Sequence, residues 1–422
     1  MPMNSRFVGT ILVTSLYSAS IAFGQQPSAS SSVQTSATLP QIPSASGPFG
    51  IGRIGFHWID TSRPDDYDPK RHRELMVYFW YPTAKSADAK GQYLPGAAQM
   101  DALPEIHEFM GREFGNIWAP IVSGEISSHA IDRAPVANSG TPFPVVTFSH
   151  GLGSTGFEYT VLIEHLVSHG YVVASIEHTY TAKAVWFPDG RVVTQRNASP
   201  PVGLSQSERM NWMMKQVSIG ISEGAVDVRF VIDRMTQLNR NKNQFALAGS
   251  IDLKRIAAMG HSGGAEFAAR ACQQDSRIQG CVDLDGAMVP FAALPIYGED
   301  RTMRQPLLFL EAYHPDNRMG GSPDQIAEYY KVKGQQLQEL PPGSYDVVLH
   351  SPEIAHPSFS DRPLLFHGRD GFPETPIVLH NFDLITQFVG AFLDKTLLGE
   401  KQPLFDGRAS PVPEAILTAY GH

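Results

Sequence analysis

The segment 260–264 restricts the fold more than any other part of this 422-residue chain. It reads Gly-His-Ser-Gly-Gly, directly follows the apolar run 256–259 and continues into helix-forming residues from Ala265. A G-x-S-x-G sequence between a strand and a helix forms a sharp turn that exposes its central serine above a sheet, and its flanking residues must be small. The pattern therefore predicts a strand–turn–helix unit that presents Ser262 as a nucleophile.

Apolar runs and helical patterns alternate on both sides of this turn. Strand patterns occur at residues 51–59, 75–81, 144–148, 171–176, 256–259, 281–284, 307–310 and 347–349. Helical patterns occur at residues 160–169, 226–238, 266–272 and 384–398. Nearly continuous apolar strands that alternate with helices indicate an α/β fold with a mostly parallel central sheet and helices on both faces. Functional residues of such sheets lie at the carboxyl ends of the strands.

The N-terminus predicts export from the cytoplasm. Residues 1–24 combine Arg6, a mostly apolar segment and the small residues Ala22 and Gly24 at the two positions that a signal peptidase needs, which is the pattern of a cleaved signal peptide. Residues 25–48 are rich in Ser, Gln, Pro and Ala and are predicted to be a flexible linker. Residues 49–422 then form one domain, with residues 183–220 as a candidate lid or pocket wall. The expected location is the periplasm or the outside of the cell.

The charge balance and the cysteine count limit the classes of partner. The chain has 33 Lys and Arg against 42 Asp and Glu, a net charge of −9. This argues against binding to nucleic acid and against electrostatic docking on an anionic membrane. Two cysteines, Cys272 and Cys281, cannot build a zinc ribbon or an iron–sulfur site. Whether they form a bridge or remain buried thiols stays open. No metal motif or phosphate loop is present, so no metal and no cofactor is expected.

A glycine-containing loop follows the strand that ends near Phe148. It reads His-Gly-Leu-Gly over residues 150–153. Acyl transfer needs two N–H groups directed at the oxyanion that develops on the substrate. In a strand–turn–helix site of this kind one N–H belongs to the residue after the nucleophile, here Gly263, and the other to a loop such as this one.

Several histidines and carboxylates are candidates for the general base and for the acid that orients it. His356 follows the strand 347–349 in a loop rich in turn-forming residues, which favours it as the base. The competing histidines are His314, His350, His367 and His380. Two candidate acids belong to the strand pattern 281–284, with Asp285 at its end and Asp283 two residues deeper on the same face, and two others, Glu311 and Asp316, follow the next strand. Spacing alone does not choose among these acids.

Taken together, these motifs resemble the platelet-activating factor acetylhydrolases of the plasma or isoform II type, within the α/β-hydrolase superfamily. The similar stretches are residues 143–153 (FPVVTFSHGLG), 169–178 (HGYVVASIEH), 259–264 (MGHSGG), 284–290 (LDGAMVP) and 356–361 (HPSFSD). The resemblance implies an α/β-hydrolase fold over about residues 50–400. It also implies Ser262 as nucleophile, Asp285 as triad acid and His356 as base, with the Leu152 and Gly263 amides as the oxyanion hole.

The chain departs from the family at Gly263, where the family usually carries a bulky residue. We expect this departure to widen the space beside the nucleophile. The resemblance implies a secreted serine esterase that hydrolyses short or oxidised sn-2 acyl esters of phospholipids, with a small-molecule or lipid ester as its partner and at most transient contact with a lipid surface. The alternatives are a broader carboxylesterase, lipase or polyester hydrolase of the same fold, and a catalytically silent lipid- or partner-binding protein.

Overall fold

The computed structural model describes most of the chain after residue 38. The described residues are 39–86, 89–196, 199–286, 302–313, 327, 331, 333–366, 373–407 and 410–421. The predicted signal peptide and residues 25–38 of the predicted linker lie outside them. Residues 39–48 pack on the fold instead of linking to it: Ile42 is buried, and the Gly47 N–H donates to Ser168 Oγ at 3.2 Å. The folded domain therefore begins earlier than the predicted boundary.

One large sheet dominates the described residues, with the strand order β14-β13-β12-β11-β10-β6-β7-β2-β1-β5. In this order the strands β13, β12, β11, β10, β6 and β7 run parallel to one another. At the two ends of this block, β14 pairs antiparallel with β13 and β2 pairs antiparallel with β7. Their bounds are β1 Gly50–Pro64, β2 His72–Thr83, β5 Ala130–Asp132, β6 Phe143–Ser149, β7 Val172–Glu177, β10 Ile251–His261, β11 Ile278–Leu284, β12 Leu307–Ala312, β13 Ser344–Leu349 and β14 Ala415–Tyr420. The predicted α/β fold with a mostly parallel sheet is confirmed.

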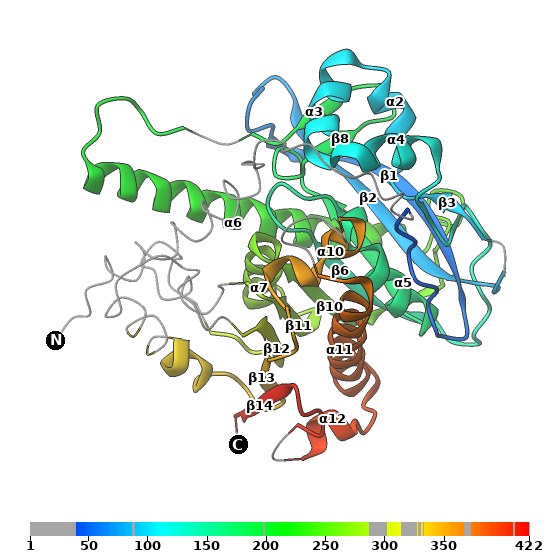
Figure 1. Cartoon of the computed structure of the whole chain (residues 1–422), viewed down its shortest axis with the longest axis vertical. Helices are drawn as coiled ribbons and strands as arrows, with labels where there is room; N and C mark the ends of the chain where they lie inside the picture. The colour runs from blue at the N-terminus through cyan, green and yellow to red at the C-terminus, as the bar shows by residue number, and fades with distance from the viewer. Residues whose placement is uncertain are drawn as a thin grey trace.

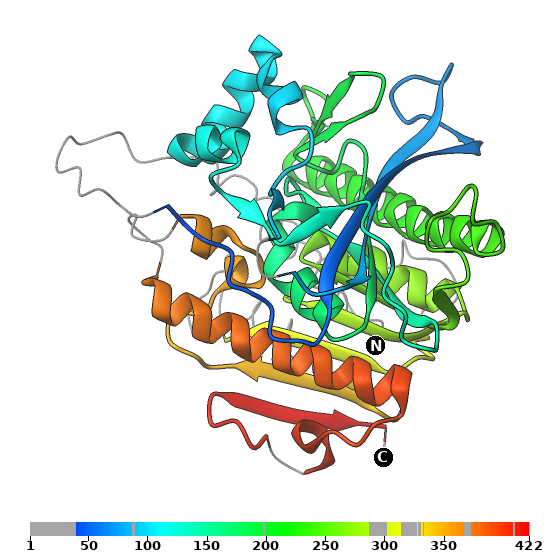
Figure 2. The same cartoon turned by 90° about the vertical axis from the view of Figure 1, so that its right-hand side faces the viewer.

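Helices cover both faces of this sheet (Figures 1 and 2). On one face, α5 (Thr160–Ser168) and α11 (Thr375–Leu393) share a core with the short helices α2 (Ala97–Asp101), α3 (Pro104–Phe114) and α4 (Trp118–Ser123). On the other face, α6 (Gln206–Leu238) and α7 (Gly263–Gln274) form a second core with the strands. Val228, Val231, Ile232 and Met235 are fully buried, which is the helical period expected for the side of α6 that faces the sheet.

Two small two-stranded sheets are separate from the large sheet. The hairpin of β8 (Ala184–Trp186) and β9 (Val192–Thr194) lies within residues 183–220, and β3 (Gly91–Gln92) pairs with β4 (Ser127–Ser128). In the hairpin, Phe187 is fully buried, and a Cβ on Gly96 would lie 2.7 Å from Trp186 Cε3. These aromatic side chains thus pack against the fold. A lid role for residues 183–220 stays a prediction.

Two helices begin earlier than their apolar patterns predict. The helix expected at 226–238 begins at Gln206 because Ser205 and Glu208 form a capping box, in which Ser205 Oγ accepts the Glu208 N–H and Glu208 Oε2 accepts the Ser205 N–H. The helix expected at 384–398 begins at Thr375. The range Thr375–Leu398 is long and apolar enough to span a membrane, but 56% of its apolar window is buried inside the fold. Its burial identifies it as a core helix.

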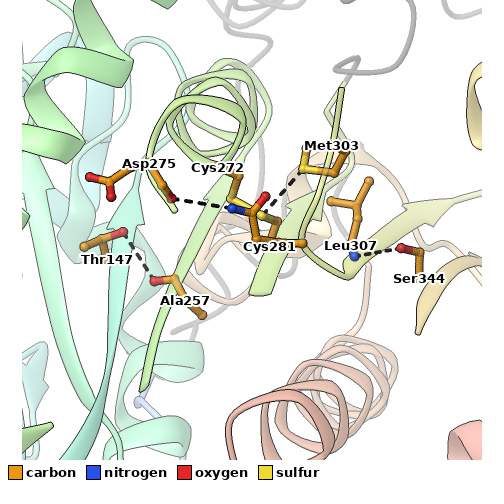
Figure 3. Close-up of a disulfide and its surroundings, with 9 residues drawn as sticks. Thr147, Ala257, Cys272, Asp275, Cys281, Met303, Leu307 and Ser344 are labelled. Carbon is orange, nitrogen blue, oxygen red and sulfur yellow. Dashed lines mark hydrogen bonds between the residues drawn. A yellow bond between two sulfur atoms is a disulfide. The ribbon is translucent and has the colours of Figure 1, made fainter. Parts of the chain in front are cut away.

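Cys272 and Cys281 form a disulfide (Figure 3), which resolves the question that the sequence leaves open. Cys272 lies in α7, the helix that follows Ser262, and Cys281 lies in β11, the strand that leads to Asp285. Both cysteines are buried, and Met303 Sδ lies 3.9 Å from Cys281 Sγ. The bridge therefore ties together the two elements whose ends carry the predicted nucleophile and acid.

Candidate active site

Ser262 occupies a strained turn between β10 and α7. Its backbone has φ 54° and ψ −126°, a conformation that residues with a side chain rarely adopt. A Cβ on Gly260 would lie 2.1 Å from the Gly264 carbonyl oxygen, and a Cβ on Gly264 would lie 2.3 Å from that of Ser149. Only glycine fits at these two positions. The Ser262 N–H donates to the Leu284 carbonyl at 3.0 Å, which fixes the turn to the end of β11.

Asp285 follows β11 and is held in place by β12. Its backbone is also left-handed, with φ 48°, and its N–H donates to the Leu310 carbonyl at 2.8 Å. Asp285 Oδ1 accepts the Ala312 N–H at 2.9 Å, and Oδ2 accepts a hydrogen bond from His356 Nδ1 at 2.6 Å. The carboxylate thus holds the proton of His356 on Nδ1, which leaves Nε2 as the nitrogen able to act as a base.

The Asp285–His356 pair connects a buried carboxylate to a more accessible imidazole. The Asp285 side chain is 4% exposed and the His356 side chain is 26% exposed. Among the described residues, no hydrogen bond joins His356 to Ser262 Oγ, a bond that is often long in hydrolases without substrate. The imidazole nevertheless lies near the serine, because its ring centroid is 4.5 Å from that of His261, the residue before Ser262.

The other candidate acids within the described residues have different partners. Glu311 Oε1 accepts a hydrogen bond from Lys333 Nζ at 2.5 Å. Asp283 Oδ1 accepts the Gly286 N–H at 2.8 Å, and burial raises the pKa of Asp283 to about 8. Among the described residues, neither carboxylate is hydrogen-bonded to a candidate base. Asp316 lies outside the described residues.

The competing histidines are also engaged elsewhere where they are described. His350 stacks on Tyr313, with 4.1 Å between ring centroids. His380 Nε2 lies 3.3 Å from Glu414 Oε1. His314 and His367 lie outside the described residues. His356 is thus the candidate base that the structure brings together with Asp285.

The loop 150–153 passes directly beside the nucleophile. A Cβ on Gly151 would lie 3.5 Å from Ser262 Cβ, so the loop backbone runs close to the serine. A Cβ on Gly263 would lie 2.5 Å from Leu152 Cγ, so the two predicted oxyanion residues are also in contact. Within the described part of the chain, the N–H groups of Leu152 and Gly263 have no acceptor. Gly263 begins α7, where the helix dipole favours negative charge.

The space beside Gly263 is filled, contrary to the expectation from the sequence. The missing side chain was expected to widen the pocket next to the nucleophile. The Leu152 side chain lies there instead, with Cγ, Cδ2 and Cδ1 within 3.1 Å of the position that a Cβ on Gly263 would take. The expectation of an open space is wrong, because a neighbouring loop supplies an apolar group where the turn lacks one.

A chain of hydrogen bonds that the sequence analysis missed joins the loop 150–153 to the base. The Gly151 N–H donates to Tyr159 Oη at 3.0 Å, and the Tyr159 hydroxyl donates to His261 Nδ1 at 2.8 Å. His261 Nε2 then donates to the His356 carbonyl oxygen at 3.1 Å. Burial and the nearby His356 hold the pKa of His261 well below its ordinary value, so this ring is neutral and carries its proton on Nε2. His261 occupies the variable position of the serine motif, but nothing in the spacing pairs it with Tyr159.

Metal ligands do not gather in this region. Within the described ranges, no group of three or more His, Cys, Asp or Glu side chains is arranged to hold a metal ion. The site itself brings together a strained serine, an imidazole with one oriented nitrogen and, among the described residues, two amide N–H groups without an acceptor. These are the parts that nucleophilic acyl transfer requires.

The sheet and the serine turn define the α/β-hydrolase fold. A ferulic acid esterase from Streptomyces cinnamoneus shares it, with a TM-score of 0.67 at 25% sequence identity, over 90% of this chain and 100% of that one. Residues 34–335 match the family of platelet-activating factor acetylhydrolase, isoform II. The chain belongs to this family, as its sequence motifs suggested.

Similar proteins of this family come from animals and a fungus. Platelet-activating factor acetylhydrolase of Cavia porcellus is 24% identical over 286 residues, which span 64% of this chain and 60% of that protein. A protein of Arthroderma benhamiae named "Probable 1-alkyl-2-acetylglycerophosphocholine esterase" is 22% identical over 89% of this chain and 93% of its own length. The likeness to the fungal protein extends over nearly the whole of both chains.

Proposed function

We propose that this protein is an exported serine esterase that hydrolyses short or oxidised sn-2 acyl esters of phospholipids. The observation that carries the proposal is the hydrogen bond from His356 Nδ1 to Asp285, beside a serine held in a strained turn. The name of the fungal relative, which refers to an esterase of 1-alkyl-2-acetylglycerophosphocholine, supports the substrate class.

The proposed reaction passes through an acyl-enzyme. Ser262 Oγ attacks the ester carbonyl carbon while His356 Nε2 accepts the hydroxyl proton. The carbonyl oxygen becomes an oxyanion that accepts the Leu152 and Gly263 N–H groups. His356 then donates the proton to the leaving alcohol, and a water molecule, activated by the same nitrogen, releases the acid and restores Ser262. Asp285 keeps the imidazole in the required tautomer throughout.

Export has support from two separate features. Residues 1–24 have the composition of a signal peptide. The Cys272–Cys281 disulfide is a bond that persists in oxidising compartments and is rare in the cytosol. Both features fit a protein that folds in the periplasm or outside the cell. N-terminal sequencing of the mature protein tests this, with a new terminus near Gln25 as the expected result.

A second candidate is a carboxylesterase with broader specificity. The structural likeness to a ferulic acid esterase favours it, because that protein is named for an aromatic ester and not for a lipid. The two candidates separate on substrate: a phospholipid esterase favours 2-acetyl and 2-glutaroyl glycerophosphocholines over methyl ferulate, whereas the broader enzyme does not.

The test compares the wild-type protein with Ser262→Ala on these substrates. Loss of the nucleophile should lower kcat by about 10⁶-fold without unfolding the protein. Circular dichroism and the melting temperature serve as controls for the fold. Dialysis against EDTA should leave the wild-type rate unchanged. Near-normal turnover by folded Ser262→Ala contradicts the proposed mechanism, and a wild-type protein that hydrolyses none of these esters contradicts the proposed substrate class.

A further inference from the structure

We propose that the Leu152 side chain limits the length of the acyl group, in place of the side chain that the serine turn lacks at Gly263. This inference rests on the proposed esterase function and deepens it. Leu152 then contributes twice to the site: its backbone N–H faces the oxyanion, and its side chain forms an apolar wall beside the acyl carbons. The two contributions are separable, because a substitution of the side chain retains the N–H.

The contact with Gly263 places this side chain at the reaction centre. A Cβ on Gly263 would lie 2.5 Å from Leu152 Cγ, 2.9 Å from Cδ2 and 3.1 Å from Cδ1. All three distances are shorter than a normal van der Waals contact, so the isobutyl group occupies the volume that a side chain at position 263 would need. Gly263 directly follows Ser262, and the wall therefore stands next to the nucleophile.

The backbone that carries Leu152 is fixed on both sides. The Gly151 N–H donates to Tyr159 Oη at 3.0 Å, and the Gly153 N–H donates to the Thr181 carbonyl at 3.0 Å. The Leu152 side chain is nevertheless 40% exposed. One side of it thus rests on Gly263 while another remains open to a ligand.

The chemistry of the oxyanion hole brings the acyl chain to this open side. An ester carbonyl oxygen that accepts the Leu152 N–H places the first acyl carbons within a few ångströms of the Leu152 side chain. An apolar branch there contacts a short acyl chain favourably and obstructs a longer one. A single methylene admitted to or excluded from such a pocket changes the specificity constant by about 10–200-fold.

The main experiment measures kcat/KM for p-nitrophenyl acetate and p-nitrophenyl octanoate, which share one leaving group. Leu152→Ala should raise the octanoate-to-acetate ratio by at least about tenfold, and Leu152→Phe should lower it. Ile416→Ala is the matched control, since Ile416 is an exposed apolar residue of β14 at the edge of the sheet. Its ratio should equal that of the wild type.

A second experiment tests the contact itself. Gly263→Ala introduces a Cβ that overlaps the Leu152 side chain, so it should change the octanoate-to-acetate ratio in the wild-type background. In the Leu152→Ala background the overlapping atoms are absent, and the same substitution should change the ratio less. Such non-additivity is the signature of two residues in contact.

Two results overturn the inference. One is an octanoate-to-acetate ratio that stays within twofold of the wild type in folded Leu152→Ala and Leu152→Phe. The other is a change in kcat/KM that the Leu152 variants show only when the alcohol of an acetate ester is varied, and not when the acyl chain is varied. That result assigns Leu152 to the leaving-group side of the site. Either result leaves the proposed function intact as long as Ser262→Ala abolishes hydrolysis, whereas turnover by Ser262→Ala refutes the proposed function itself.

Discussion

A serine, a histidine and an aspartate meet in two regions of this molecule, and only one of the two has the features of an active site. The first region is the strained Ser262 turn with the Asp285–His356 pair. The second lies inside the protein, where the Ser149 hydroxyl donates to His178 Nε2 at 3.0 Å and His178 Nδ1 donates to Asp227 Oδ2 at 3.0 Å.

The second array is sealed inside the fold. Ser149, His178 and Asp227 are each 0% exposed. Asp227 also accepts hydrogen bonds from Arg73 Nη2 at 2.6 Å and from Arg63 Nη2 at 2.7 Å. Burial would raise the pKa of Asp227, but the charge of Arg73 and the hydrogen bond from His178 outweigh it and hold this pKa far below its ordinary value. Ser149 lies in the regular strand β6, without a strained turn. This array joins strands and helix α6 and has no access for a substrate.

A hydrogen-bonded Ser-His-Asp chain does not by itself define a catalytic site. The features that distinguish the first region are a left-handed backbone at both Ser262 and Asp285, a partly exposed His356 and two amide N–H groups without acceptors. The same residue types thus serve stability in one region, and we propose that they serve catalysis in the other.

The largest expected effect is that of Asp285→Asn on turnover. An amide at this position stabilises the wrong tautomer of His356, so kcat should fall by about 10⁴-fold while the melting temperature changes little. Steady-state kinetics and thermal unfolding measure the two quantities. Glu311→Gln is the matched control, because Glu311 ends the adjacent strand but pairs with Lys333, and it should lose less than about tenfold. The reverse ranking of these two variants would refute the proposed triad.

The corresponding change in the buried array should affect stability instead. Asp227→Asn leaves Arg63, Arg73 and His178 without their common partner, and breaking a buried ion pair in this way costs about 3–5 kcal/mol. Chemical denaturation measures the loss in the free energy of unfolding. Glu223→Gln removes only the outer, partly exposed partner of Arg63 and should cost less than about 1 kcal/mol. An Asp227→Asn protein that keeps wild-type stability but loses turnover would show that the second array contributes to catalysis.

A smaller effect on turnover is expected from the hydrogen bonds that join Gly151, Tyr159 and His261 to the His356 carbonyl oxygen. Tyr159→Phe removes the hydroxyl that links Gly151 to His261, and leaves a buried N–H without its acceptor. We expect kcat to fall by about tenfold, equivalent to about 1–2 kcal/mol, with KM nearly unchanged. Tyr171→Phe is the control, since its hydroxyl donates to Asp394 away from the site. Equal kinetics for both variants would show that this series of hydrogen bonds does not contribute to turnover.

A last prediction concerns the pH dependence of stability at Glu177, which ends β7. Burial raises the pKa of Glu177 from 4.5 to about 8, and its Oε2 has no hydrogen-bond partner among the residues that the structure describes. Between these values the folded state holds a proton that the unfolded state has lost, so this group makes the protein less stable as the pH rises. Glu177→Gln removes that dependence.

The expected advantage of Glu177→Gln over the wild type therefore grows from pH 5 to pH 8, by at most about 1.4 kcal/mol per pH unit. Urea unfolding of both proteins at several pH values measures it. An advantage that is constant, or that shrinks as the pH rises, contradicts the raised pKa.

The main features of the fold were predictable because its signals are local. Continuous apolar strands and helical periodicity depend on neighbouring residues, and the parallel sheet follows from their alternation. The early start of α6 was also readable, since Ser205 and Glu208 carry the spacing of a capping box. The short strand β14 and the helices between residues 97 and 123 have weaker patterns, and they form because the rest of the fold provides a surface for them.

The candidate site was only partly predictable, because its geometry depends on contacts between distant residues. Asp285 and Glu311 both follow strands, and spacing could not rank them. The left-handed backbone of Asp285 and the pairing of Glu311 with Lys333 separate them in the structure. The filling of the space at Gly263 by Leu152 depends likewise on a loop more than 100 residues earlier in the chain.

The most direct test of the account is to label the wild-type protein with a fluorophosphonate and to map the adduct by peptide mass spectrometry. The reagent reacts with an activated, accessible serine. We expect a single adduct on the peptide that contains Ser262, no adduct on the peptide that contains Ser149, and no labelling of Ser262→Ala. An adduct on a different serine, or labelling that survives Ser262→Ala, would contradict the assignment of Ser262 as the nucleophile.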